Sequence, residues 1–329
     1  MTGSVLLLGA AGNSGRLIAA ELAARGLPIR LAGRRREPLA ELARELAAED
    51  VVTVDAAEPG SLAGVGLVLS TVGPFTRRAA PVIDACLAAR VPYVDIANEW
   101  PAVRALLDRD EEARARGVAL VTGAGFGPAA TETLVLRLVD GVSESVRVAA
   151  AAGVSRTSDG VRETVRDLIA EGVAVLYRDG QVVREPLGSG ATLLTFGGAA
   201  RRMLPAPLGD LETARLASRA PDVVAYLADP AGRGADAGAD SYAWAEVRAA
   251  GGEVRTAELH TGEGVRATAA IAAETARRVL AGVEPGAWTV GGLFGAALVT
   301  DATGARVTVS GPRPAGGAGS SARPSRPGG

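Results

Sequence analysis

Histidine, cysteine and aromatic residues are scarce in this chain of 329 residues. It contains one histidine, one cysteine and 3% aromatic residues. The single cysteine excludes an internal disulfide and suits a reducing compartment. One histidine and one cysteine together leave no ligand set for a zinc ion. We therefore expect no metal site, and a core that is filled by Ala, Val and Leu.

The chain also lacks a strong net charge and long apolar runs. Its formal charge of −2 gives no electrostatic reason to expect nucleic acid or an anionic membrane as a partner. No uninterrupted apolar run reaches the length of a membrane span, and no signal peptide pattern precedes the first apolar segment. The sequence thus predicts a cytoplasmic globular protein of a length that suits two domains.

Strand-like and helix-like segments alternate through the first third of the chain. Short apolar runs predict strands at residues 4–8, 29–32, 51–55, 67–72, 93–97 and 118–123. Helical spacing predicts helices at residues 13–25, 38–49, 80–90 and 101–116. This βαβ order predicts a doubly wound parallel sheet of the Rossmann type.

The pattern changes after residue 128, where further strand-like segments cluster. They lie at residues 146–154, 173–185, 192–196, 242–249 and 254–260, with helical patterns at 131–139, 160–171 and 265–281. Asp179-Gly180 and Gly251-Gly252 signal hairpins. We expect an α/β chain with a Rossmann domain over residues 1–128 and an α+β substrate and dimerisation domain, with a mainly antiparallel sheet, over residues 129–282. The composition of residues 311–329 predicts a disordered tail.

A run of small residues joins the first predicted strand to the first predicted helix. It reads Gly9-Ala10-Ala11-Gly12-Asn13-Ser14-Gly15 and follows G-x-G-x-x-G, with Ala10 at the first glycine position. Small residues there allow a tight turn and a close approach of backbone N–H groups to a pyrophosphate, and the helix N-terminus adds donors. The placement of the run in a βαβ chain predicts dinucleotide binding, with a purely structural turn as the alternative.

The end of the second predicted strand indicates which nicotinamide cofactor binds. It reads Leu31-Ala32-Gly33-Arg34-Arg35-Arg36, whereas an NAD site usually has a carboxylate there for the ribose 2′-OH. Arg34 can fork onto a 2′-phosphate or stack on adenine, and Arg35 can add charge. The alternative, most applicable to Arg36, is a solvated cluster at a helix start. NADP(H) is thus favoured over NAD(H).

Several further segments carry a family resemblance. Besides residues 9–15 they are Ala32-Gly33-Arg34, Ser70-Thr71-Val72-Gly73-Pro74-Phe75, residues 81–86, Tyr93-Val94-Asp95-Ile96 with Glu99, residues 262–269, and Pro285-Gly286-Ala287-Trp288-Thr289 with Phe294-Gly295. Together they resemble the saccharopine dehydrogenase-like family, which includes saccharopine reductases and trans-acting enoyl reductases of lipid biosynthesis.

The resemblance implies a two-domain oxidoreductase with its active site between the domains. It also implies that the last helices, at about residues 283–310, pack back on the Rossmann domain. The implied cofactor contacts are Thr71, Val72, Gly73, Pro74 and Phe75 beside the nicotinamide ribose, and Asp55 and Ala56 near the adenine. Each segment follows a predicted strand, where open α/β sheets bind ligands. Gly127 stands where family members commonly have an acidic residue, so we do not expect saccharopine as the substrate.

Three side chains are candidate catalytic groups. Glu99 follows the fifth predicted strand and can handle a proton or a substrate amine; alternatively it is a favourable charge at the start of the next helix. Tyr177 and Tyr242 lie on predicted strands of the second domain, and we expect that sheet to form the other wall of the cleft. Arg156 and Arg162 can clamp a substrate carboxylate, with solvated charge as the default interpretation.

The combined hypothesis is an NADPH-dependent reductase of a C=N or C=C bond on a small metabolite. One alternative is an amino-acid-type dehydrogenase that oxidises a C–N bond. Another is a non-catalytic NADP(H)-binding sensor or scaffold. We expect a small-molecule substrate and neither nucleic acid nor a membrane as partner, with a homodimer as the candidate assembly.

The cofactor prediction can be tested at Arg34. Loss of one charge-assisted hydrogen bond costs about 1.5–3 kcal/mol, so Arg34→Ala should weaken NADPH binding by about tenfold or more. NADH binding should hardly change, because NADH lacks the 2′-phosphate. Isothermal titration calorimetry measures both affinities, and equal affinities of the wild type for NADPH and NADH would contradict the prediction.

Overall fold

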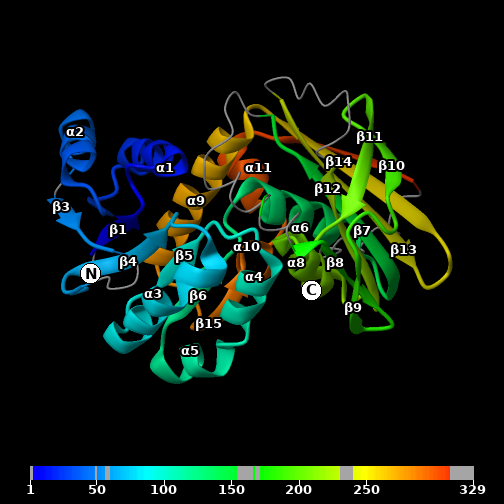
Figure 1. Cartoon of the computed structure of the whole chain (residues 1–329), viewed down its shortest axis with the longest axis horizontal. Helices are drawn as coiled ribbons and strands as arrows, with labels where there is room; N and C mark the ends of the chain where they lie inside the picture. The colour runs from blue at the N-terminus through cyan, green and yellow to red at the C-terminus, as the bar shows by residue number, and fades with distance from the viewer. Residues whose placement is uncertain are drawn as a thin grey trace, which may run out of the picture.

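The structure is a computed structural model that describes residues 3–48, 50–55, 60–153, 166, 171–229 and 240–311. Two sheets lie side by side, with helices between them (Figure 1). The predicted helix at residues 160–171 lies mostly outside the described residues, as do Ala56, Arg156, Arg162 and residues 312–329 of the predicted tail.

The first sheet is parallel and has the strand order β3-β2-β1-β4-β5-β6-β15. Its strands are β1 (Ser4–Leu8), β2 (Ile29–Gly33), β3 (Asp50–Thr53), β4 (Val65–Ser70), β5 (Tyr93–Asp95), β6 (Ala119–Thr122) and β15 (Gly286–Thr289). All five residues of β1 are buried, as expected for the centre of a parallel sheet covered on both faces. The predicted Rossmann sheet is confirmed.

Helices cover both faces of this sheet. They are α1 (Asn13–Ala24), α2 (Arg36–Leu46), α3 (Phe75–Ala89), α4 (Trp100–Leu107), α5 (Asp110–Arg116) and α9 (Gly264–Leu280). The single helix expected at residues 101–116 is interrupted, and forms α4 and α5. Helix α9 lies in the sequence range of the expected second domain, yet it packs along α1 and against β4 and β5. Its buried face is rich in alanine, which permits this close approach to the Rossmann domain.

The second sheet has nine strands among the described residues. Seven follow the order β10-β11-β12-β7-β13-β14-β16, and the β8–β9 hairpin joins at β12. The strands are β7 (Ser143–Ala151), β8 (Val173–Arg178), β9 (Gln181–Pro186), β10 (Thr192–Phe196), β11 (Ala199–Pro205), β12 (Asp222–Ala228), β13 (Ser241–Ala249), β14 (Val254–Thr261) and β16 (Arg306–Ser310). The sheet is mixed, because β12 and β7 are parallel while the other pairs are antiparallel.

The C-terminal segment divides between the two sheets. Strand β15 joins the Rossmann sheet, and α11 (Leu298–Thr303) packs on α9. Helix α10 (Val290–Phe294) contacts β15 and the helices α6 (Phe126–Leu138) and α8 (Gly209–Ser218). Strand β16, however, pairs with β14 in the second sheet. We expected helices at about residues 283–310, but residues 306–310 form a strand of the second sheet, and the β-branched Val307, Thr308 and Val309 suit a strand.

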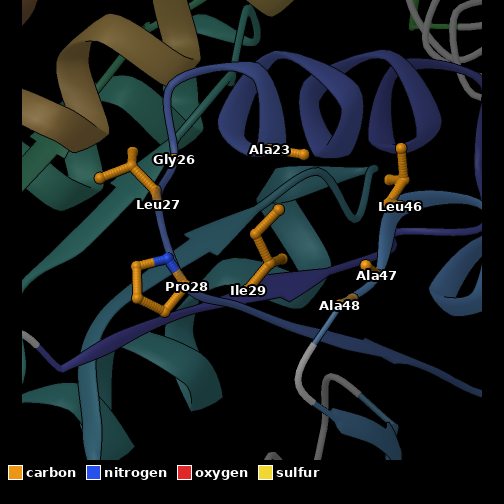
Figure 2. A pocket seen from close by; sticks show the side chains of 8 residues that line it. All are labelled: Ala23, Gly26, Leu27, Pro28, Ile29, Leu46, Ala47 and Ala48. Atoms are coloured by element: carbon orange, nitrogen blue, oxygen red, sulfur yellow. The ribbon is translucent and has the colours of Figure 1, made fainter.

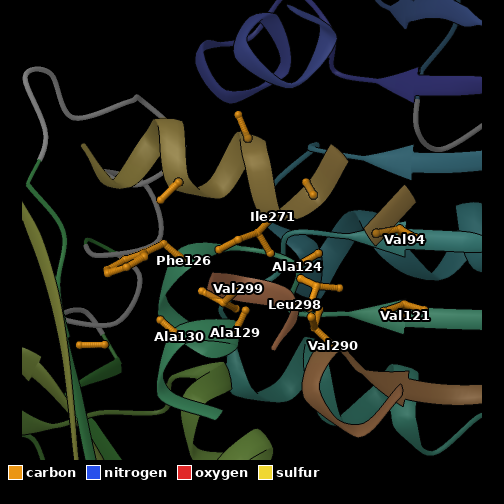
Figure 3. Close-up of a cluster of buried hydrophobic side chains, with 14 of the residues drawn as sticks. Val94, Val121, Ala124, Phe126, Ala129, Ala130, Ile271, Val290, Leu298 and Val299 are labelled. Carbon is orange, nitrogen blue, oxygen red and sulfur yellow. The ribbon is translucent and has the colours of Figure 1, made fainter. Parts of the chain in front are cut away.

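A continuous core joins the two sheets through α6 (Phe126–Leu138). Ten of the thirteen residues of this helix are buried. Figure 3 shows Phe126, Ala129 and Ala130 of α6 among side chains of α9, α10 and α11 and of two Rossmann strands. Helix α8 (Gly209–Ser218) packs beside α6 and also contacts α4. The second sheet is thereby held at a fixed place against the Rossmann domain.

Glu132, buried within α6, fixes the C-terminal segment to this core. Its carboxylate accepts hydrogen bonds from the Thr289 hydroxyl and from the backbone N–H groups of Gly291 (2.7 Å) and Gly292 (3.2 Å). A Cβ atom at Gly291 would lie 2.5 Å from Glu132 Cδ, so only glycine fits there. Burial raises the pKa of Glu132 to about 7, although the three donors favour the charged form.

We expect Glu132→Gln to lower the free energy of unfolding by about 1–3 kcal/mol, because the amide leaves a buried N–H group without an acceptor. The folded-state pKa of about 7 lies above the ordinary 4.5. The stability linked to this proton is therefore complete below pH 4.5 and is lost as the pH rises to about 7. Urea unfolding should thus show a larger difference between wild type and variant at pH 5 than at pH 8. The opposite order would contradict the prediction.

Candidate functional site

The glycine-rich turn is shaped to receive a phosphate group. Gly9 has φ +81°, and a Cβ atom there would lie 2.5 Å from Thr71 Oγ1. Gly12 is the N-cap residue of α1, and no side chain caps the first turn of that helix. The first N–H groups of α1, from Asn13 onward through Ser14 and Gly15, are therefore available to an anion.

The loop after β4 lies against this turn. The Thr71 hydroxyl donates to the backbone oxygen of Leu8 (2.9 Å), at the end of β1. Val72 follows, and its Cγ2 atom lies 3.0 Å from the position that a Cβ at Gly9 would take. The Gly73-Pro74 peptide bond is cis, and Phe75 begins α3. The structure therefore brings residues 71–75 to the carboxyl end of the sheet, beside the glycine-rich turn.

The arginines after β2 are exposed at the same edge of the sheet. Within the described parts of the chain, no carboxylate forms an ion pair with Arg34 or Arg35. Both guanidinium groups can thus bind an external anion. Arg36 begins α2, in agreement with its helix-start interpretation. Asp55 follows β3 and forms an ion pair with Arg78 of α3, with 4.0 Å between Asp55 Oδ1 and Arg78 Nη1.

Glu99 is the N-cap residue of α4, and both of its carboxylate oxygens accept backbone hydrogen bonds. Oε1 accepts from the N–H group of Phe75 (3.1 Å), and Oε2 accepts from that of Asn98 (3.1 Å). The side chain therefore ties the end of β5 to the loop that ends β4. This geometry favours a positioning role for Glu99 and occupies the oxygens that a proton donor would use.

A short backbone bridge connects the Glu99 loop to the second domain. The N–H group of Gly209 donates to the Asn98 oxygen (2.8 Å), and the N–H group of Trp100 donates to the Pro207 oxygen (3.0 Å). Glu99 and Leu208, which lie between these hydrogen-bonded residues, are paired as an isolated antiparallel β-bridge. The start of α8 is thus held at the carboxyl end of β5.

Tyr177, on β8, lies in a buried hydrogen-bond network between the domains. Its hydroxyl donates to Glu212 Oε2 (2.7 Å) and accepts from Arg104 (3.2 Å). Trp100 Nε1 donates to the same Glu212 oxygen (3.1 Å), and Arg215 pairs with the other oxygen. Burial and the Glu212 carboxylate raise the pKa of Tyr177, which makes it a weaker acid. The network gives this tyrosine a structural role.

Tyr242, on β13, lies on the opposite face of the second sheet. Its ring stacks on His260, with 4.8 Å between ring centroids, and it borders a cluster that includes Phe196 and Trp244. Tyr177 belongs instead to the core on the side of α6 and α8. The expectation that one sheet face presents both tyrosines to a cleft is therefore wrong. Strand pairing sets the alternation of side chains, but the sequence alone does not show which face meets the helices.

Two buried carboxyl groups near the site were missed from the sequence. Asp95 accepts hydrogen bonds from the Thr122 hydroxyl (2.8 Å) and from the N–H groups of Ala97 and Gly123, so it fixes the loops after β5 and β6. Burial raises its pKa to about 6. Asp210, in the first turn of α8, accepts from the Thr131 hydroxyl at 2.9 Å. An acidic residue after Gly209 is a typical helix-start signal that could have located α8.

A pocket of about 310 Å³ lies away from these groups. Its lining residues are Ala23, Gly26, Leu27, Pro28, Ile29, Leu46, Ala47 and Ala48 (Figure 2). It opens at the start of β2, which is the amino end of the sheet. Ligands of open α/β sheets bind at the carboxyl end, so this pocket is not the cofactor site.

Comparison with known proteins agrees with this geometry. Residues 5–121 match the family model of the saccharopine dehydrogenase NADP binding domain. This part of the chain is therefore similar to that NADP-binding domain. The matched domain confirms the expected cofactor, NADP(H). A solved structure of saccharopine dehydrogenase (L-Glu forming) from Saccharomyces cerevisiae superposes with a TM-score of 0.66 over 94% of this chain and 99% of that chain. The sequence identity is 15%, so this likeness concerns the fold.

The curated relatives match a smaller part of the chain than this solved structure does. A trans-acting enoyl reductase of Mycobacterium leprae is 32% identical over 151 residues, which are 43% of this chain and 36% of the relative. One from Mycobacterium tuberculosis H37Rv is 33% identical over 145 residues, 41% of this chain and 35% of the relative. The match spans little more than a third of these relatives. Among the helices that the structure describes, none is long and apolar enough to cross a membrane.

The two later glycines of the turn should respond differently to a side chain. A Cβ atom at Gly12 would meet only the Gly9 oxygen, at 3.1 Å, whereas one at Gly15 would lie 2.2 Å from that oxygen. We expect Gly12→Val to abolish NADPH binding in a folded protein, because the side chain blocks the pyrophosphate. Gly15→Val should unfold or strongly destabilise the domain. Circular dichroism and calorimetry separate the effects, and normal NADPH binding by Gly12→Val would show that the turn is only structural.

Proposed function

We propose that this chain is an NADPH-dependent oxidoreductase of the saccharopine dehydrogenase-like family that reduces a C=C or C=N bond of a small metabolite. The observation that carries the proposal is the meeting of three features at one edge of the Rossmann sheet. They are the start of α1 without a side-chain cap, the exposed Arg34 and Arg35, and the loop of residues 71–75. The enoyl reductase names of the curated relatives favour the C=C bond.

Different residues of the chain bind different parts of the cofactor. The N–H groups at the start of α1 receive the pyrophosphate, and Arg34 and Arg35 receive the 2′-phosphate. Residues 72–75 line the nicotinamide ribose, and Glu99 holds this loop through the N–H group of Phe75. When bound, the cofactor supplies the hydride, and the protein orients the reacting groups and supplies the electrostatics.

The rival function is a sensor that binds NADP(H) without turnover. The experiment follows NADPH absorbance after addition of a panel of 2-enoyl thioesters of N-acetylcysteamine and of cyclic imines. We expect oxidation of NADPH with at least one enoyl thioester, and none with NADH at equal concentration. Tight NADPH binding by calorimetry, with no oxidation by any member of the panel, would contradict the proposed function.

The positioning role of Glu99 predicts a specific kinetic change. Glu99→Gln keeps the shape but turns an NH₂ group toward one of the two backbone N–H donors, which removes about one hydrogen bond. We expect kcat to fall by about tenfold, with the pH dependence of kcat/KM unchanged in shape. If Glu99 is instead the proton donor, the loss is about 10²–10⁴-fold and one limb of the pH profile disappears. Steady-state kinetics across pH distinguish the two roles.

A further inference from the structure

Asp210 is a buried carboxyl group with fewer hydrogen bonds than a carboxylate requires. Four carboxyl side chains are buried among the described residues: Asp95, Glu132, Asp210 and Glu212. Three of them, Asp95, Glu132 and Glu212, each accept at least three hydrogen bonds. Asp210 accepts one from another side chain, that of Thr131, and no described protein group donates to its Oδ2 atom. An ionised carboxylate is poorly stabilised there, so the site favours the protonated acid.

Asp210 belongs to the second domain but lies at the carboxyl end of the Rossmann sheet. The bridge between Asn98 and Gly209 places the first turn of α8 directly beyond β5. Glu99 follows Asn98 in the loop after β5, and its carboxylate accepts a hydrogen bond from the N–H group of Phe75. Asp210 is therefore anchored to the same loop that positions the nicotinamide side of the proposed cofactor site.

The Asn98 side chain lies on the same side of Gly127 as Asp210. Its Oδ1 atom is buried and has no donor among the described groups. Asn98 Nδ2 and Asp210 Oδ2 each lie 3.4 Å from the position that a Cβ at Gly127 would occupy. Because Gly127 has no side chain, the two polar groups face the same space. The atoms that face this space are thus the Asn98 amide nitrogen and Asp210 Oδ2, and a proton on Asp210 Oδ2 points a donor into it.

Among the described residues, no charged side chain of the helices α4, α6 and α8 around Asp210 lacks a partner. Glu99, at the start of α4, and Arg104, Glu132, Glu212 and Arg215 are engaged in the hydrogen bonds described above. Arg137, in the last turn of α6, donates to the Ala296 oxygen (3.3 Å). The strands β7 and β12 contribute apolar residues to the core beneath α8, namely Val146, Val148, Val223 and Ala225. Burial raises the pKa of Asp210 to about 6, against smaller effects of Thr131 and of its own backbone N–H group.

We infer that Asp210 donates the proton that completes the reduction, with Asn98 beside it at the edge of the site. This inference rests on the proposed function. The hydride of NADPH adds to one atom of the substrate double bond, and the Asp210 proton adds to the other. NADP⁺, the reduced product and the Asp210 carboxylate remain, and a proton from solvent restores the acid. The sequence alone pointed to Glu99 for this task, but both oxygens of Glu99 are occupied.

The test compares three variants, using the enoyl thioester that the wild type reduces. For the wild type, kcat/KM should be constant at low pH and fall above the pKa of the acid. Asp210→Asn should lower kcat/KM by about 10²–10⁴-fold at low pH and remove that pH dependence, with NADPH affinity unchanged. Gly127→Ala should fold, because the added methyl group meets its neighbours at ordinary contact distance. It should lower kcat/KM by about tenfold, since the methyl group enters the space between Asn98 and Asp210.

Glu212→Gln is the matched control, because it removes another buried carboxyl group from the same helix. It should reduce stability yet keep the wild-type pH profile. Carboxyl ¹³C NMR of aspartate-labelled protein, assigned by the missing signal in Asp210→Asn, should show a titration near pH 6 rather than near the ordinary value of about 3.9. Full activity and an unchanged profile in Asp210→Asn, or titration near 4, would overturn the inference alone. A wild type that binds NADPH but reduces no compound would overturn the proposed function as well.

Discussion

The backbone bridge between residues 98–100 and 207–209 is the constraint on which the site depends. It ties the start of α8, a second-domain helix, to the loop after β5 of the Rossmann sheet. Glu99 reaches from this loop to Phe75, and Trp100 reaches from it to Glu212. One pair of backbone hydrogen bonds thus sets the position of the nicotinamide-side loop and of the second domain together. A shift of this bridge would move both walls of the proposed site.

Buried carboxyl groups lie at the junction of the two domains. Buried carboxyl groups are costly unless donors surround them, and Glu132 and Glu212 have such donors from two or more separate elements. These groups fix relative positions, since a carboxylate with several donors tolerates little displacement. Asp210 departs from this pattern, because one of its oxygens has no donor. Asp210 is therefore the buried carboxyl group with an oxygen that no described donor of the protein occupies.

The Rossmann half was predictable because its signals are local. The buried strands read as apolar runs, and the glycine-rich turn lies between the first strand and helix. Helix α8 was not found, because Asp210 and Glu212 face the interior and remove the usual separation of polar and apolar faces. The sequence placed Glu99 after the fifth strand, but its hydrogen bond to Phe75 depends on the packing of β4 against β5, which the sequence does not show. For Tyr177 and Tyr242, strand membership was predictable while the sheet face was not.

A crystal structure with NADP⁺ bound tests the central claim most directly, because it locates the nicotinamide relative to the bridge. We expect the pyrophosphate at the N–H groups of Asn13, Ser14 and Gly15, and the 2′-phosphate at Arg34. The nicotinamide ring should lie against residues 72–75, on the side where Asn98 and Asp210 meet. A nicotinamide directed away from the bridge between residues 98–100 and 207–209, or a cofactor bound elsewhere on the sheet, would contradict the assignment of this junction as the active site.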